Sequence, residues 1–384
     1  MVEKVKLVVV FLLLNAANIF AVGQSAVITL VFPSGARSLG MGEIGTALAD
    51  DEDVLFYNPA GLGLRNSRWY GGASTMFCEQ LLPMFKIPDL WHFHGALCFQ
   101  FPFTTTVGFG KDFNRINFGS DDFTGKNTSY EYVVTNSVGF NLDGLGIKNH
   151  AFGISPKYFY SAFAPGTGPG NQGTAQSVAL DLGYLWQFLP FMRFGLTLAN
   201  MGPSVYYISQ DQEDPIPFTI NAALAYKDDF CTRGNERLRF LEICAESRFD
   251  REVVKNYPDK SPDPFWKAIY TGLLHDTSMT FQEQLDEFVL HTGVELKILS
   301  TLSLRHGWLI DRAGQRFENH LGFGVSLFNH FQMDFSYILA PRGYVGWLFG
   351  HGGASGARDE QWGMNLTFFR MFCWNENDRR WWIK

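Results

Sequence analysis

The strongest constraint on the fold is an alternation of apolar and polar residues that recurs along most of the chain. Within residues 175–188, every second residue from Val178 onward is apolar or aromatic, and most of the residues between them are small or polar. Similar runs occupy residues 288–298, 331–339 and 361–369. A period of two places the two kinds of side chain on opposite faces of a β-strand. The chain is therefore predicted to be all-β, with strands whose two faces meet different surroundings.

About fourteen such runs follow residue 66, most of them near the ~9–11 residues that a tilted membrane strand needs. Every second connection is long, as at 78–92, 200–216 and 250–287, and most of the others are short. Outer-membrane barrels have short periplasmic turns and longer external loops. The sequence therefore predicts a transmembrane antiparallel β-barrel over residues 68–369. The expected strands begin at Arg68, Phe93, Thr104, Tyr130, His150, Ala175, Phe191, Pro217, Arg239, Phe288, Ser300, Phe317, Phe331 and Gln361.

Composition fits a membrane barrel better than the alternative, a soluble β-sandwich. Aromatic residues make up 16% of the 384 residues, yet the mean hydropathy is only -0.05. Lipid-facing and lumen-facing residues alternate in a membrane barrel, so its mean hydropathy stays ordinary. A sandwich would not sort its loops by length in this way. The net charge of -7 argues against nucleic acid as a partner, because a phosphate backbone needs a basic surface.

Residues 1–23 have the features of a signal peptide. Lys4 and Lys6 precede the apolar run 7–14, and the small residues Ala21 and Gly23 mark a cleavage region. An N-terminal membrane anchor is the alternative, but the apolar run is shorter than the ~20 residues of a spanning helix. We therefore expect an exported protein of the outer membrane, in contact with its lipid.

The charged residues of the strand patterns fall mainly on the face opposite the aromatic residues. A lysine or arginine that faces lipid at the midplane costs about 2–4 kcal/mol, so these side chains are expected inside the barrel. They form either a paired network that holds the wall or part of a substrate path. The candidate lumen network consists of Glu242, Glu246, Arg248, Glu295, Lys297, Arg305 and Asp334.

Residues 24–67 precede the first strand and are rich in glycine and acid. A barrel of about fourteen strands is too wide for side chains alone to fill, so this segment is predicted to be a plug in the lumen. Gly40 and Gly42 let the backbone pass close to the wall. Asp50 and Asp51 suit the start of a short helix at residues 54–57. A second helical turn is expected to follow, with Asn58 as its N-cap and Pro59 as its first residue. Ala60 and Gly61 complete this candidate plug motif.

Residues 35–63, GARSLGMGEIGTALADDEDVLFYNPAGLG, resemble the N-terminal signature of the FadL-like outer-membrane superfamily, whose plug carries an Asn-Pro-Ala motif. The R-x-L-G-M-G opening and the F-Y-N-P-A-G-L ending are most similar to the PorV/PorQ group of type IX secretion, as are the later stretches SPKYFYSAF, LDLGYLW and FGLTLANMGP. The resemblance implies a fourteen-stranded barrel with a plug, in which Asn58, Pro59 and Ala60 are the plug motif.

Two functions follow from this resemblance. PorV-type members bind secreted cargo with C-terminal sorting domains and associate with the translocon and the attachment complex, which implies a protein-binding barrel. FadL members move long-chain fatty acids or other hydrophobic small molecules, which implies a transporter. Transport would need an apolar pocket near the outer rim and a gap in the wall, from a strand kink at Pro156 or from a displaced segment around residues 35–45. The long connection 250–287, with an expected helix at 265–274, and the extension 370–384 are candidate contacts for a partner.

No enzyme, cofactor or metal site is predicted. The chain contains no G-x-S-x-G, H-E-x-x-H or Walker pattern. His92 and His94 would share one face of a strand, but no third ligand lies nearby in the sequence, so a loop or rim role is expected. The five cysteines form no C-x-x-C pair, and Cys98 and Cys244 are expected to act as small apolar residues inside strands.

Overall fold

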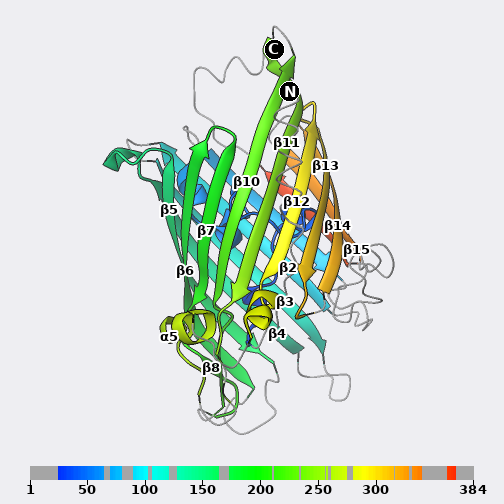
Figure 1. Cartoon of the computed structure of the whole chain (residues 1–384). Coiled ribbons are helices and arrows are strands. Elements are labelled where there is room, and N and C mark those ends of the chain that lie inside the picture. The colour runs from blue at the N-terminus through cyan, green and yellow to red at the C-terminus, as the bar shows by residue number, and fades with distance from the viewer. Residues whose placement is uncertain are drawn as a thin grey trace.

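Fourteen strands form a closed antiparallel barrel (Figure 1). The computed structural model describes residues 25–64, 70–79, 90–102, 106–120, 128–163, 173–209, 212–232, 235–255, 257, 261–274, 280–314, 316–327, 331–339 and 361–368. The expected signal peptide and the C-terminal extension 370–384 lie outside these residues. The barrel strands are β1 (Tyr70–Glu79), β2 (Leu90–Pro102), β3 (Thr106–Ser120), β4 (Thr128–Asn141), β5 (His150–Ala162), β6 (Thr174–Leu189), β7 (Met192–Met201), β10 (Thr219–Thr232), β11 (Asn235–Glu252), β12 (Val289–Ile298), β13 (Leu302–Asp311), β14 (Arg316–Leu327), β15 (Phe331–Leu339) and β16 (Gln361–Phe368).

Each strand pairs with its neighbours along the chain, and β1 pairs with β16 from Ala73↔Phe368 to Glu79↔Trp362, which closes the cylinder. Two short strands, β8 (Val205–Tyr206) and β9 (Glu213–Asp214), form a separate sheet in the connection between β7 and β10. The predicted barrel is confirmed. The largest error in a predicted strand start is four residues, at Asn235 where Arg239 was expected.

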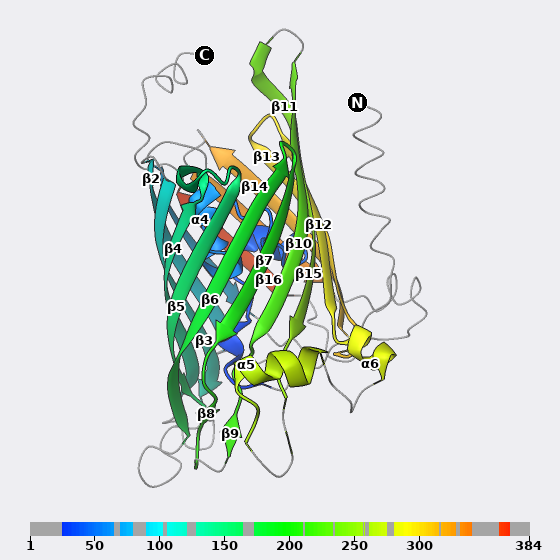
Figure 2. The same cartoon turned by 60° about the vertical axis from the view of Figure 1, so that its left-hand side comes forward.

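Several strands are longer than the sequence patterns suggested. β11 has 18 residues and its partner β10 has 14. Their hairpin extends past the neighbouring strands at the short-turn end of the barrel (Figure 2). The alternation of apolar and polar residues arises only where one face of a strand meets lipid. Strand ends that extend into water lack this alternation and were therefore not predicted.

The wall has no kink in register at Pro156. Thr135 pairs with Lys157 on one side of the proline and Val138 with Ile154 on the other. Between these two pairs, each strand advances by three residues, so the register is unchanged across Pro156. A proline lacks the N–H group that would donate to the ladder, which explains the missing pairing without any displacement of the strand. The wall gap considered at this position is therefore not present.

The two faces of the wall differ as a membrane barrel requires. On β13, Ser303, Arg305 and Asp311 are buried inside, whereas Leu304 and Trp308 are exposed outside. Large apolar side chains are exposed in the same way on the strands from β2 to β6 and from β11 to β15. This inversion of the usual pattern, with polar residues inside and apolar residues outside, is the arrangement that lipid favours.

Residues 25–64, which we call the plug, lie inside the cylinder (Figure 2). They contain η1 (Ile28–Leu30), α2 (Ala36–Leu39), α3 (Val54–Tyr57) and α4 (Gly61–Leu64). The plug begins at the long-loop end of the barrel, where the N–H of Ala26 donates to the carbonyl of Pro215 (2.9 Å). It ends near the short turn between β2 and β3, where Gln100 donates to the carbonyl of Leu62 (2.7 Å). The plug thus crosses the lumen from one end to the other.

Most other helices lie at the long-loop end, while the turn η2 (Asp143–Leu145) follows β4 at the opposite end. α5 (Phe265–Ala268) and the π-helix η3 (Ile269–Leu274) confirm the helix expected at 265–274. α6 (Phe281–Asp286) was not predicted, although Thr280 and Glu283 form its capping box. Among the described residues, no helix is long and apolar enough to cross a membrane.

Candidate functional site

The carboxylate of Glu246 on β11 holds a turn of the plug. Its two oxygens accept hydrogen bonds from four successive backbone N–H groups, those of Gly45 (3.0 Å), Thr46 (2.9 Å), Ala47 (3.0 Å) and Leu48 (2.7 Å). Glu246 is fully buried. Buried N–H groups need an acceptor, and a carboxylate is a strong one. This predicted lumen residue therefore fixes the conformation of the plug directly.

A chain of ion pairs joins the plug to three further strands. Arg37 on α2 donates to Asp50 (2.6 Å) and Asp51 (2.8 Å) of the plug and to Glu295 of β12 (2.7 Å). Glu295 also accepts from Arg305 of β13 (2.8 Å), which in turn donates to Asp334 of β15 (2.7 Å). The predicted residues Glu295, Arg305 and Asp334 thus form one network, and its centre is Arg37, which the sequence did not identify.

This network adds a second role to the plug acids. Asp50 and Asp51 bind Arg37, while Asp51 Oδ1 also accepts from the backbone N–H of Asp53 (3.1 Å) at the start of α3. Asp53 at the N-cap makes no side-chain capping bond. The ion pairs dominate because a guanidinium attracts a carboxylate more strongly than the start of a one-turn helix does. Burial alone would raise the pKa of Asp50, but the nearby cations of Arg37 and Lys227 lower that pKa well below its usual value.

Two wall histidines bind backbone carbonyls of the plug. His291 Nδ1 lies 2.8 Å from the carbonyl oxygen of Gly42, and His320 Nδ1 lies 2.7 Å from that of Leu39. A carbonyl oxygen only accepts, so Nδ1 carries the hydrogen in both rings. The other nitrogen of His291 lies 2.9 Å from Arg248 Nη2 and 2.7 Å from Asp250 Oδ1. The predicted residue Arg248 therefore supports a histidine that binds the plug.

The predicted motif residue Asn58 connects three parts of the molecule. Its Nδ2 donates to the carbonyl oxygens of Thr46 (2.8 Å) in the plug and Tyr184 (3.1 Å) in β6. Its Oδ1 accepts from the N–H of Ala60 (3.1 Å), which starts the turn before α4. Asn58 is fully buried. An asparagine fits because it supplies donors and an acceptor from one short side chain.

Glycines of the wall allow the plug backbone to lie directly against the strands. A Cβ on Gly153 would lie 2.3 Å from the nitrogen of Ala60, and one on Gly139 would lie 2.4 Å from the oxygen of Pro59. In the plug, a Cβ on Gly40 would lie 2.7 Å from Gly322 Cα, and one on Gly61 would lie 2.7 Å from the oxygen of Ala49. The wall glycines with such contacts to the plug are Gly108, Gly110, Gly139, Gly153, Gly183, Gly195, Gly293, Gly307 and Gly322.

Four of these glycines are direct neighbours across the strands. Gly108 pairs with Gly139, Gly139 with Gly153, and Gly153 with Gly183. They form a smooth row over β3, β4, β5 and β6 on which the Asn-Pro-Ala segment lies. This row was not predicted from the sequence. Glycines at inward positions of several strands were its signal, but the register that aligns them is not visible in the sequence.

The remaining predicted residues make other contacts within the barrel. Glu242 and Lys297 face each other across β11 and β12, and Glu242 accepts from Ser300 (3.1 Å). His92 and His94 were expected at a loop or rim, but they are buried within β2. Both contact Asn114 Oδ1 at 3.1 Å. Cys98 and Cys244 are buried in strands, as predicted.

A cavity of about 390 Å³ lies between the plug and the long-loop end of the barrel. Ile28, Leu30, Val31, Phe56 and Tyr57 of the plug contribute its apolar lining, together with wall residues such as Ala199. The charged lining comes mostly from the ends of the strands next to the long loops. It consists of Glu43, Lys157, Arg248, Asp250, Glu252, Glu287, Asp311 and Arg316.

One wall residue of this cavity sits in a bulge. The β6–β7 register shifts between Leu180↔Met201 and Leu182↔Leu198, and Asn200 within the shift has φ 60°. Bulges re-aim side chains. The Asn200 side chain accordingly points inward, where it accepts from Lys157 (2.8 Å) and donates to the carbonyl of Leu30 (3.3 Å). This contact ties the wall to the plug at the edge of the cavity.

No protein-family model matches this chain, and no curated protein matches it. Its structure is similar to that of the toluene transporter TbuX of Ralstonia pickettii, with 12% identity, a TM-score of 0.49 and coverage of 88% of this chain and 98% of that chain. The toluene transporter TodX of Pseudomonas putida is 12% identical with a TM-score of 0.47, and the match covers 92% of this chain and 98% of that chain. A FadL homologue of Pseudomonas aeruginosa is 10% identical with a TM-score of 0.43, and the match covers 88% of this chain and 97% of that chain. The strand pairing of this chain by itself defines the closed barrel.

Proposed function

We propose that this chain is an outer-membrane transporter for small molecules that combine an apolar body with a polar group. The cavity beside the plug carries the proposal. Its volume of about 390 Å³ lies within the ~300–1,000 Å³ of small-molecule sites. Because Phe56 and Tyr57 of the plug line it, a bound molecule would contact the part of the chain that has to move for passage.

The lining favours an amphipathic solute over a purely apolar one. Apolar side chains such as Leu30 and Phe56 share the cavity with the charged Arg248 and Asp250. Arg248 and Asp250 pair with each other (3.1 Å), but a hydrocarbon would still displace water from the charged groups of the lining, which is costly in a confined space. This refines the hydrophobic solute expected from the sequence toward molecules such as a fatty acid, which carries a polar head on an apolar chain.

The test measures fatty-acid uptake by a strain from which the gene is deleted, and by the same strain after the wild-type gene or a variant is supplied on a plasmid. Ala199→Trp fills the cavity, whereas Val178→Trp adds the same side chain on the exposed outer face of β6. We expect deletion to lower uptake of radiolabelled long-chain fatty acid, wild type and Val178→Trp to restore it, and Ala199→Trp to fail. Unchanged uptake after deletion, or full uptake with Ala199→Trp, would contradict the proposal.

A second candidate is the protein-binding barrel of a type IX secretion system of the PorV/PorQ kind. Exposed apolar side chains at the long-loop end favour it, with Trp266 66% and Tyr270 58% exposed on the two helical segments after β11. Aromatic residues of this kind are common anchors in protein interfaces. The translocon, the attachment complex and cargo with C-terminal sorting domains would be the partners. In the same deletion strain, loss of these cargo proteins from the cell surface with normal solute uptake would select this function.

A further inference from the structure

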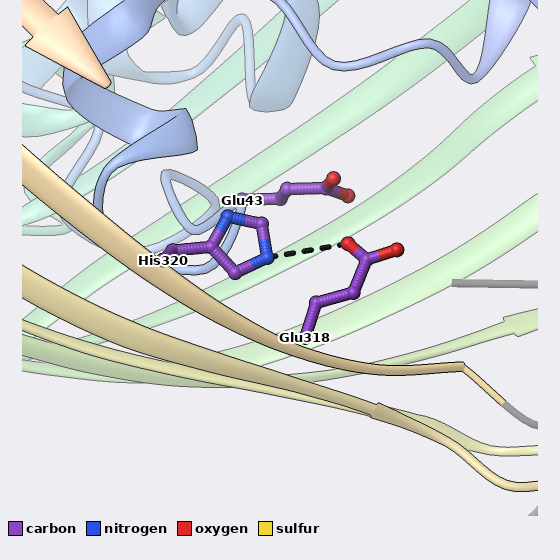
Figure 3. Close-up of side chains that lie close together, drawn as sticks. All are labelled: Glu43, Glu318 and His320. Carbon is purple, nitrogen blue, oxygen red and sulfur yellow. Dashed lines mark ion pairs between the residues drawn. The ribbon is translucent and has the colours of Figure 1, made fainter. Parts of the chain in front are cut away.

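Three side chains of the metal-binding kind meet where the plug crosses β14. Glu43 follows α2 in the plug, and Glu318 and His320 are two residues apart on β14, so they share its inward face. One ligand atom from each lies within 4.8 Å of the other two. Figure 3 shows the imidazole of His320 facing the two carboxylates. All three residues are buried, with exposures of 6%, 1% and 0%.

The hydrogen bonds of His320 leave one ring nitrogen ready to bind a cation. Its Nδ1 donates to the carbonyl of Leu39, as described above, so in the neutral ring Nε2 carries a lone pair. Nε2 makes no hydrogen bond within the described part of the chain and lies 3.4 Å from Glu318 Oε2. Metal-binding histidines commonly have this arrangement, in which the second nitrogen donates to a backbone carbonyl and fixes the ring.

The backbone also directs Glu43 toward this point. The φ angle of Glu43 is 66°, in the left-handed region that residues other than glycine rarely adopt. Such strain persists where the surrounding structure imposes it, and it is concentrated at binding sites. The close contact of Gly40 with Gly322 brings this part of the plug onto β14. The turn at Glu43 and this contact together place a plug carboxylate beside a wall carboxylate.

Two buried carboxylates at this distance repel each other unless a cation lies nearby. Arg316 lies 3.3 Å from Glu318 Oε1, on the side facing the cavity. A divalent ion between Glu43, Glu318 and His320 would be attracted by both carboxylates.

We propose that Glu43, Glu318 and His320 bind a divalent transition-metal ion of the zinc type, which fastens the plug to β14. One imidazole nitrogen with two carboxylate oxygens suits Zn²⁺, and three protein ligands leave a fourth position for water. The carbonyl-rich sites of Ca²⁺ or Mg²⁺ have a different ligand set. The proposal does not depend on the transported solute or on secretion, because it concerns only the contact between plug and wall.

The test is zinc binding to the full chain purified in detergent and treated with a chelator. Glu43→Gln removes one ligand with little change of size, and His320→Asn removes the ring nitrogen but keeps an N–H donor near the Nδ1 position. Glu131→Gln is the matched control, because Glu131 is also a wall carboxylate that binds the plug, at Thr29 (2.7 Å). Circular dichroism of each variant reports whether the barrel is folded.

We expect isothermal titration calorimetry to show one equivalent of Zn²⁺ per chain. X-ray absorption at the zinc edge should show oxygen and nitrogen ligands with the signature of one imidazole. Loss of a ligand should weaken binding by at least about 100-fold in Glu43→Gln and His320→Asn, since even outer-shell changes cost 10–100-fold. Glu131→Gln should bind as wild type does. No stoichiometric binding by wild type, or wild-type affinity in the two ligand variants, would overturn the proposal.

Discussion

Glu246 on β11 accepts a hydrogen bond from the backbone N–H of Leu48 in the plug, 2.7 Å away, and the same carboxylate accepts three more from the preceding residues. The plug has only four one-turn helices, and it packs against a wall whose inner face is polar. Its conformation therefore depends on wall side chains that satisfy its backbone.

Replacing Glu246 with Ala should loosen the plug. The change leaves four buried N–H groups without their acceptor, and each such group costs about 1–3 kcal/mol. We expect higher conductance in planar bilayers and a lower thermal unfolding temperature. Glu242→Ala is the control, since this carboxylate lies on the same strand but accepts from Ser300 near a turn. Equal conductance of the two variants would contradict the role of Glu246.

Replacing Arg37 with Met should destabilise the protein by about 3–5 kcal/mol, the range for removal of one partner from a buried ion pair. The change leaves Asp50, Asp51 and Glu295 without their shared cation. Lys297→Met removes a lumen cation that is not part of this chain of ion pairs and should cost less. Unfolding in urea measures both free energies, and similar losses in the two variants would argue against the network.

Adding one methyl group at Gly153 should displace the plug from β5. The new Cβ would lie 2.3 Å from the backbone nitrogen of Ala60, which cannot move without the Asn-Pro-Ala segment. Gly95→Ala on β2 makes the same change where the nearest atom lies 3.5 Å away. We expect raised bilayer conductance for Gly153→Ala and wild-type conductance for Gly95→Ala. If both variants conduct as wild type does, the plug does not lie on the glycine row.

The stability contributed by Asp50 should depend on pH in a defined direction. Its pKa in the folded protein is lowered well below the usual value by Arg37 and Lys227, against the effect of burial. The contribution is therefore fully present above the unfolded pKa of ~3.9 and is lost as the pH falls through the lower folded pKa. The destabilisation caused by Asp50→Asn should be constant near neutral pH and shrink at acidic pH. A destabilisation that grows as the pH falls would contradict this assignment.

The sequence predicted the strands well because their signal is local. In β6 the alternation from Val178 to Phe188 reflects lipid on one side and the lumen on the other, and that difference acts on each residue independently. The position of α3 was also predicted, at residues 54–57. The short helix is flanked by turn residues, which mark its ends in the sequence.

The contacts between plug and wall could not be predicted in the same way. Gly40 and Gly322, or Glu43 and His320, are separated by more than 270 residues, and they meet only because of the stagger of fourteen strands. Asp50 and Asp51 look like helix-start residues in the sequence, yet Arg37 binds them because the fold brings it within reach. The lumen charges were recognised as a set, but their partners depend on strand register and on the path of the plug.

The most direct test of a plug held inside the lumen is hydrogen–deuterium exchange of the full chain in detergent, read by mass spectrometry over residues 45–48. Their N–H groups bind a buried carboxylate, so we predict exchange as slow as that of the strand β11 itself. Exchange within seconds at these residues, beside a protected barrel, would show that the segment lies free in water and would contradict the account.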